Sequence, residues 1–282
     1  MGNSAAGTIV VTGATGGMGR VLCRALAERG FDVVLACRNI ERGERLREEI
    51  AAANPGRRLR VLALDLSAMD SVRGFADVLL RTGEPLRGIL NNAGIMAPRF
   101  ELTPDGYETD VAVNCLGPLL LTRLLLPLLK PDGRIVNTIS CTWRLGRIDE
   151  HFFRAGPERF GRFRTYGTSK LALLLLTLEL IRRTKNLPPN VYAVDPGIVD
   201  TNMITLHKWF DPLADALFRP FIQSPEQGAA TALHLITCRP APAMKEEYWK
   251  NGHPVPPPAS VRNHPLREWL WEETEKRLGI GL

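Results

Sequence analysis

Tyr166 and Lys170 stand four residues apart in the stretch "YGTSK", at the head of a long leucine-rich segment. Residues at this spacing lie on one face of a helix. A lysine ammonium beside a phenol favours the phenolate and lowers the pKa of the tyrosine from about 10. Such a tyrosine could give a proton to a carbonyl oxygen or take one from an alcohol. The alternative is an ordinary aromatic and an ordinary surface lysine on the first turn of a core helix.

A glycine-rich loop, "TGATGGMG", occupies residues 12–19. It follows a β-branched run that predicts a buried strand, and it precedes a segment with helical spacing of apolar residues. Glycines let the backbone approach a pyrophosphate, which the free N–H groups and positive dipole end of the following helix would bind. This context favours a dinucleotide site over a plain glycine turn, with ligands expected at Thr12, Gly13, Thr15, Gly17, Met18 and Gly19.

The second expected strand ends in "ACRN", residues 36–39. An acidic residue at that position would bond the ribose 2′-hydroxyl of NAD. Here Cys37 occupies the approximate carboxylate position and Arg38 follows it, so a guanidinium could clamp a 2′-phosphate instead. The sequence therefore predicts NADP(H) over NAD(H), with Asn39 beside Arg38 in the site. The alternative for Arg38 is a solvated loop arginine.

Short apolar runs alternate with amphipathic segments along the chain. Strands are expected at 8–13, 32–37, 59–66, 86–94, 133–140 and 190–197, and helices at 18–30, 40–54, 68–82, 106–129 and 166–184. Runs that are apolar on both faces are typical of a parallel sheet. We therefore predict one α/β domain over residues 1–282, a Rossmann fold with a doubly wound parallel sheet and helices on both faces. The weakly patterned part, about 198–265, is expected to form a small C-terminal substrate lid.

Composition narrows the class of protein further. The chain has 36 basic and 30 acidic residues, and the basic ones are scattered, which argues against a nucleic-acid surface. Five widely spaced cysteines without a C-x-x-C indicate reduced thiols, and the histidines show no metal-ligand spacing. The start "MGNSAAG" lacks the regions of a signal peptide, and no apolar run approaches the roughly 18 residues that span a bilayer. A cytoplasmic protein is expected.

Seven features occur in the order and spacing of the classical short-chain dehydrogenase/reductase family, which the sequence resembles over about residues 8–202. They are the glycine loop, Asp65 in "LDL", "NNAG" at 91–94, Asn114, Ser140, "YGTSK" and "DPGIVDT" at 195–201. The resemblance implies that Asp65 bonds the adenine amino group and that the last element closes on the nicotinamide, although its threonine could merely cap the next helix. It extends the expected cofactor set to Asp65, Leu66, Asn91, Ala93, Gly94, Tyr166, Lys170, Pro196, Gly197, Val199 and Thr201.

The resemblance also assigns roles around the reacting oxygen. Ser140 would hydrogen-bond that oxygen and polarise it, while Tyr166 would transfer the proton. Lys170 would also bond the nicotinamide ribose, and Asn114 would hold a water that links Lys170 to solvent. Two alternatives stay open: Thr142 could replace Ser140, and Asn114 could be a buried asparagine that bonds backbone.

A closer similarity, to the retinol dehydrogenase-like branch, lies in "LACRN", "NNAGIM" and "YGTSKLA". It implies an NADP(H)-dependent oxidoreductase that interconverts carbonyl and alcohol on a retinoid, a steroid or another lipophilic molecule. One departure is Ile139 before Ser140, where that branch has two serines. The "ACR" element also resembles light-dependent protochlorophyllide reductase, which stays an alternative, as does a non-catalytic NADP(H)-binding regulator. The glycine spacing disfavours a nucleotide-sugar epimerase.

Two expected helices, 106–129 and 166–184, are apolar over more than one face. Since the family often pairs these helices across a two-fold axis, we predict a homodimer, with a monomer or peripheral membrane contact as alternatives. The expected lid is rich in apolar side chains, which suits a bulky lipophilic substrate, although they could only pack the lid onto the core. These side chains are Trp209, Phe210, Leu213, Leu217, Phe218 and Phe221.

Overall fold

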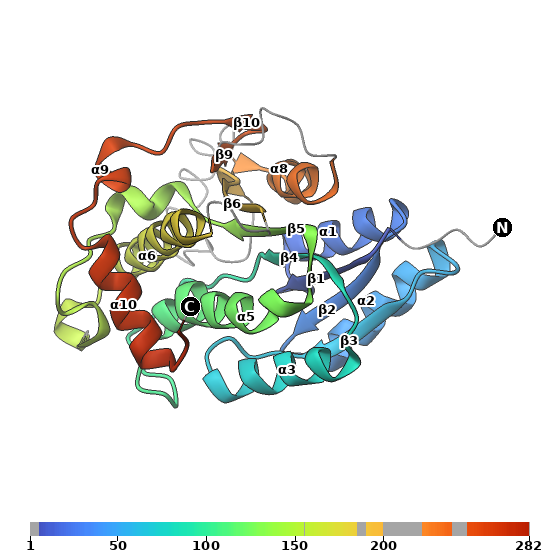
Figure 1. The fold of residues 1–282 in the computed structure, drawn as a ribbon, viewed down its shortest axis with the longest axis horizontal. Coiled ribbons are helices and arrows are strands. Elements are labelled where there is room, and N and C mark those ends of the chain that lie inside the picture. Colours follow the sequence, from blue (N-terminus) through green and yellow to red (C-terminus); the bar gives the residue numbers. More distant parts are fainter. Residues whose placement is uncertain (1–5, 155, 185–189, 200–221, 239–246, 282) are drawn as a thin grey trace, which may run out of the picture.

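An eight-stranded sheet organises the computed structural model, which describes residues 6–154, 156–184, 190–199, 222–238 and 247–281. The strand order is β10-β9-β6-β5-β4-β1-β2-β3, parallel from β9 to β3, with β10 antiparallel to β9 (Figure 1). The order reverses between β1 and β4, as in doubly wound sheets, so the predicted fold class is confirmed. The strands are β1 (Thr8–Thr12), β2 (Asp32–Cys37), β3 (Leu59–Ala63), β4 (Leu86–Asn91), β5 (Leu129–Thr138), β6 (Asn190–Asp195), β9 (Tyr248–Lys250) and β10 (His253–Pro254).

Helices cover both faces of the sheet (Figure 1). One face packs against α1 (Gly17–Glu28), α2 (Ile40–Ala53) and α8 (Pro225–Thr237), and the other against α3 (Met69–Thr82), α5 (Gly117–Leu125) and α6 (Arg162–Arg183). Strands β1, β2 and β4 are buried along their whole length. This two-sided burial explains the uninterrupted apolar runs at residues 9–11 of β1 and 33–37 of β2.

The expected helix at 106–129 is interrupted. It consists of α4 (Thr109–Val111), a π-helical turn (Ala112–Leu116), α5 and a 3-10 turn (Leu126–Leu128). Pro118 has no N–H to donate to the carbonyl of Asn114, four residues earlier, which favours the change of helical pattern there. Gly117 also requires its lack of a side chain, because a Cβ at that position would lie 2.6 Å from the carbonyl oxygen of Leu66.

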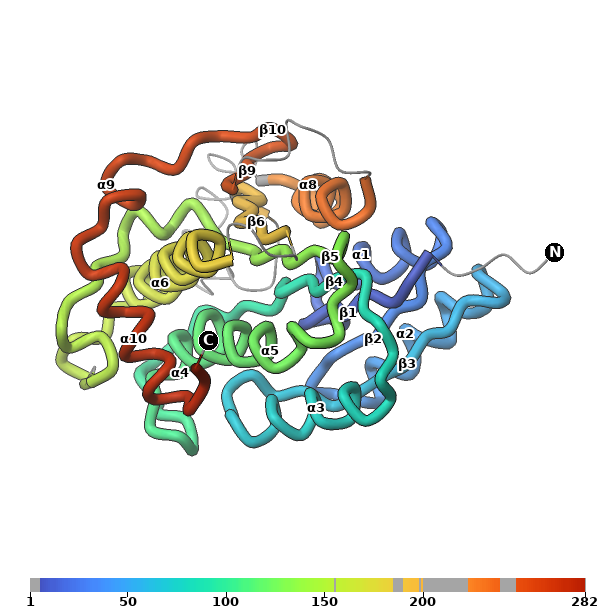
Figure 2. The backbone as a smooth tube through the Cα atoms, viewed as in Figure 1, coloured from blue at the N-terminus to red at the C-terminus, as the bar shows by residue number. Residues whose placement is uncertain are grey.

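A C-terminal helix, α10 (Arg267–Leu278), lies across α6 and ends near α5 (Figure 2). Its Trp271 is fully buried beneath Arg123 and Arg183. On α6, Glu179 accepts from Arg183 at 2.8 Å and pairs with Arg267 at 3.2 Å. Helix α10 of the same chain therefore covers the additional apolar face of α6 on which the homodimer prediction depended.

The helix Thr109–Leu128 is long and apolar enough to cross a membrane, unlike what we expected from the sequence, where Arg123 and Pro127 divide the run. However, 72% of its most apolar window is buried inside the fold. It packs against α3 and α6, as the central helix of an α/β core does.

The segment expected to form a lid, 198–265, contributes to the core layers where it is described. Helix α8 packs against α1, and β9 pairs in parallel with β6. The short strand β7 (Ile198–Val199) pairs with β8 (Ile222–Gln223). Residues 200–221, which hold the expected lid aromatics and Thr201, lie outside the described part of the chain.

Candidate active site

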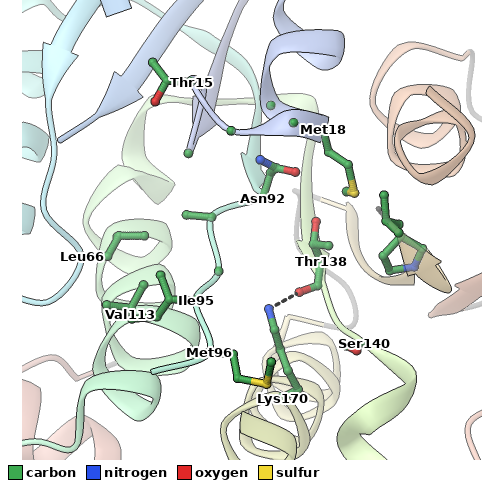
Figure 3. Close-up of a pocket in the computed structure, with 18 of the residues that line it drawn as sticks. Thr15, Met18, Leu66, Asn92, Ile95, Met96, Val113, Thr138, Ser140 and Lys170 are labelled. Atoms are coloured by element: carbon green, nitrogen blue, oxygen red, sulfur yellow. Dashed lines mark hydrogen bonds between the residues drawn. The ribbon is translucent and has the colours of Figure 1, made fainter. Parts of the chain in front are cut away.

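A cleft of about 500 Å³ opens where β1, β2, β4, β5 and β6 end. This is the edge at which doubly wound sheets bind ligands. Figure 3 shows side chains from both ends of the cleft, with Thr15 and Met18 far from Lys170 and Ser140. Most predicted site residues line it: Gly13, Thr15, Gly17, Met18, Gly19, Arg38, Asn39, Asp65, Leu66, Ala93, Gly94, Ser140, Tyr166, Lys170, Pro196, Gly197 and Val199.

The glycine loop requires its glycines. Gly13 has a positive φ of 64°, and a Cβ there would lie 2.9 Å from the Cα of Ala93. A Cβ on Gly19 would lie 2.1 Å from the carbonyl oxygen of Gly13. Helix α1 begins directly after Gly16 without a side-chain cap, so its first N–H groups point toward the cleft for an anion. The loop fits a dinucleotide pyrophosphate.

The end of the cleft beside β2 and α2 is basic. Arg38 and Arg42 are both exposed and both line it. Asn39 caps α2 by accepting from the backbone N–H of Arg42 at 2.8 Å. Cys37 is buried, and its thiol donates to the carbonyl of Asn39 at 3.3 Å. In place of a ribose-binding carboxylate, this strand end therefore presents two guanidinium groups. Asp65, the nearby acid, accepts from the N–H and the hydroxyl of Ser67 at 2.9 and 2.6 Å.

Two predicted cofactor ligands lie beneath the cleft floor. The hydroxyl of Thr12 accepts from the backbone N–H groups of Asn92 and Ala93, each at 3.0 Å. Asn91 donates to Asn137 at 2.7 Å and to the hydroxyl of Thr122. Both residues are buried and do not line the cleft. Their hydrogen bonds link the end of β1 to the chain after β4, and β4 to β5.

Tyr166 and Lys170 lie on one face of α6, which begins at Arg162 and so places Tyr166 on its second turn. The lysine Nζ lies 5.9 Å from the centre of the phenol ring. It donates to the carbonyl oxygen of Thr138 at 2.9 Å, the dashed line in Figure 3. A Cβ on Gly94 would come within 3.3 Å of the same nitrogen, so this glycine keeps the lysine accessible from the cleft.

Burial governs the protonation of the pair. It raises the pKa of Tyr166 to about 12, although a hydrogen bond with Ser140 acts in the opposite direction. Burial also lowers the pKa of Lys170 to about 8. The net shift of the Tyr166 pKa is thus upward, opposite to the direction expected from the lysine alone, because desolvation disfavours the charged phenolate. At neutral pH the phenol keeps its proton and can donate it.

Ser140 follows β5 and is 9% exposed. Its hydroxyl accepts from the hydroxyl of Thr142 at 2.9 Å and lies in hydrogen-bond contact with Tyr166. Thr142 also lines the cleft, but its hydroxyl bonds that of Ser140. Ser140 is therefore the hydroxyl that lies beside the phenol of Tyr166.

Asn114 lies in the π-helical turn behind the cleft and is fully buried. Its amide accepts from the N–H of Ile95 and donates to the carbonyl of the same residue, both at 2.8 Å. The second amide hydrogen goes to the hydroxyl of Ser169 at 2.9 Å. The side chain thus bonds backbone, as the alternative reading expected, and connects the loop after β4 to α6.

Several residues of the cleft escaped the sequence prediction. Arg42 stands in the first turn of the helix after "ACRN", so its charge was a usable signal. The apolar wall had no single sequence signal, because three separate segments build it: the end of "NNAGIM", the π-helical turn and α6. Its members are Ile95, Met96, Val113 and Phe163.

The fold, the glycine loop and the Tyr166–Lys170 face together define a dinucleotide-dependent oxidoreductase of the Rossmann type. The family described as short chain dehydrogenase matches residues 7–208. The chain belongs to that family.

Within the family, the chain is similar to proteins named for lipophilic alcohols. It is 38% identical over 277 residues to human retinol dehydrogenase 11, covering 97% of this chain and 86% of that protein. It is 35% identical to polyprenol dehydrogenase of Mus musculus, covering 96% and 84%. A crystal structure of an uncharacterised protein from Mycobacterium paratuberculosis superposes with a TM-score of 0.75 at 31% identity, covering 98% and 94%. The expected retinol dehydrogenase-like resemblance is confirmed.

Proposed function

We propose that the protein is an NADP(H)-dependent oxidoreductase that interconverts a carbonyl and an alcohol on a lipophilic substrate. The observation that supports this best is the placement of Tyr166, Lys170 and Ser140 in one cleft with the glycine loop. When bound, the nicotinamide would supply or accept the hydride. The protein's own residues would bind, orient and move the proton.

NADP(H) is the proposed cofactor because Cys37 occupies the approximate position of the carboxylate that would select NAD, and two guanidinium groups, Arg38 and Arg42, line the cleft beside it. The glycine loop would hold the pyrophosphate, and Asp65 the adenine. Lys170 would bond the nicotinamide ribose.

Tyr166 is the proposed proton donor to the carbonyl oxygen. Its raised pKa keeps the phenol protonated, which suits carbonyl reduction. Ser140 would donate a hydrogen bond to the same oxygen and stabilise the negative charge that develops there. Asn114 would hold a water beside Lys170 through its backbone carbonyl, because its side-chain N–H groups already bond Ile95 and Ser169.

A lipophilic substrate is proposed from the apolar wall of the cleft. Ile95, Met96 and Val113 line one side, and Phe163, which is 46% exposed, lines the mouth. The names of the similar proteins, retinol and polyprenol dehydrogenase, agree with this chemistry. The homodimer stays a prediction, now without the leucine faces as its support. A cytoplasmic location with contact to a membrane surface stays one too.

The test is NADPH oxidation, followed at 340 nm, with all-trans-retinal, steroid ketones and medium-chain aldehydes. The proposal expects turnover with at least one apolar carbonyl. Tight NADPH binding without turnover on the whole panel would favour the non-catalytic regulator.

A further inference from the structure

A buried carboxylate that no motif singled out, Asp110, lies one helical turn before Asn114. It is fully buried in α4. One of its oxygens, Oδ1, accepts from the backbone N–H of Ala97 at 2.7 Å, just as Asn114 accepts from Ile95. The two side chains therefore clamp alternate residues of the loop that follows β4 and forms a wall of the cleft.

The other oxygen of Asp110, Oδ2, is buried without a hydrogen-bond partner in the described part of the chain. Such an atom is costly unless a charge or a function explains it. Three charged groups act on the Asp110 carboxylate. Glu108, the N-cap of its helix, repels it, while Lys170 and Arg162 of α6 attract it. Its charge also acts on Tyr166. The charge of Asp110 is thus coupled to both Tyr166 and Lys170.

Lys170 carries the opposite charge and is buried as well. Its ammonium is buried and bonds a neutral carbonyl, that of Thr138. Burial disfavours the ammonium, while the charges of Asp110 and of the neighbouring Cys115 favour it. Cys115 is fully buried, and burial raises its thiol pKa, so it is neutral at working pH. Asp110 is therefore the negative charge available to the buried lysine.

We propose that Asp110 is a positioning residue that keeps Lys170 protonated inside the cleft. Helix α4 packs against α6, so the carboxylate acts on the lysine through the interior of the protein, while its Oδ1 holds the wall loop at Ala97. This inference rests on the proposed function for its role in the reaction. The charge coupling itself is a property of the protein alone.

Asp110→Asn separates the charge from the clamp, because an amide oxygen can still accept from Ala97. Carbonyl reduction should decline at high pH as Lys170 loses its proton, with an apparent pKa of about 8 in the wild type. In Asp110→Asn this decline should begin roughly one pH unit lower, since a nearby opposite charge shifts a pKa by about 1–3. The assay is NADPH oxidation with all-trans-retinal from pH 6 to 10. An unchanged pH profile overturns the proposal.

Glu108→Gln is the matched control. Glu108 is also buried and is the N-cap of the same helix. One of its oxygens accepts from the N–H of Val111, and the other has no hydrogen-bond partner among the described residues. It is not among the groups that act on Lys170. Its loss should leave the high-pH decline in place. An equal shift in this variant would overturn the proposal, because any buried carboxylate would then have the same effect.

A second measurement needs neither cofactor nor turnover. A double-mutant cycle in Tm compares wild type, Asp110→Asn, Lys170→Met and the double variant. Burial raises the pKa of Asp110 to about 7, so the carboxylate is charged above that pH and neutral well below it. The two changes should be non-additive at pH 7.5 and additive at pH 5.5. Additivity at both pH values contradicts the coupling, even if no carbonyl is turned over and the proposed function fails.

Discussion

Lys170 donates a hydrogen bond from its Nζ to the backbone carbonyl of Thr138 at 2.9 Å, which ties helix α6 to the end of strand β5. Ser140 follows Thr138 by two residues, and Tyr166 lies one helical turn before the lysine. This bond therefore joins the segment that carries Ser140 to the helix that carries Tyr166. The lysine has a structural role in addition to any role toward a cofactor.

Arg38→Asp tests the cofactor assignment. It should raise the KM for NADPH by about 10- to 100-fold, because a charge-assisted hydrogen bond contributes roughly 1.5–3 kcal/mol. The KM for NADH should change little, since NADH has no 2′-phosphate. Arg45→Asp is the control, because Arg45 is exposed on α2, the helix that follows Arg38, pairs with Glu41 and does not line the cleft. Equal effects of Arg38→Asp on the two cofactors would refute the phosphate clamp.

Gly19→Ala tests the fit of the phosphate loop. The new methyl group would meet the carbonyl oxygen of Gly13, a rigid backbone atom, so we expect a loss of about 1–3 kcal/mol in the free energy of unfolding. NADPH binding, measured by fluorescence, should weaken in parallel. Gly74→Ala is the control: it lies in α3 with open space around it and should be neutral or stabilising. A stable Gly19→Ala protein that binds NADPH normally would contradict this geometry.

Trp271→Ala tests the docking of α10. The side chain is fully buried, so its removal should lower the free energy of unfolding by about 3–5 kcal/mol in urea denaturation. Val78→Ala, at a 48% exposed position, should cost little. Light scattering on both variants shows whether the uncovered leucines of α5 and α6 then associate. A negligible loss would mean that α10 is not packed as described.

Features with a local physical cause were readable from the sequence. Each β-branched run predicts a strand, and the glycine spacing predicts the phosphate-binding loop. The fold class follows from the alternation of strands with amphipathic helices. Motif membership did not reveal which way a side chain points. Thr12 and Asn91 belong to cofactor motifs, yet both bond across the core between strands.

Features that depend on segments far apart in sequence were not readable. The cover of α6 by α10 joins Glu179 to Arg267, and nothing in either helix alone predicts it. The upward direction of the Tyr166 pKa shift likewise depends on how deeply the folded chain buries the phenol. Asp110 was visible as an acid in an apolar segment, but its significance required the position of Lys170.

The central claim is that Tyr166 transfers a proton to or from the substrate oxygen. Its most direct test is the kcat/KM of Tyr166→Phe for NADPH-dependent reduction of the best carbonyl substrate. Loss of a positioned general acid should lower this value by about 10²–10⁴-fold. Because Tyr166 also belongs to the expected cofactor set, the Kd for NADPH should rise by far less than the loss in kcat/KM, and Tyr107→Phe, a change outside the cleft, should stay close to wild type. Activity of Tyr166→Phe within a few-fold of the wild type would contradict the mechanism.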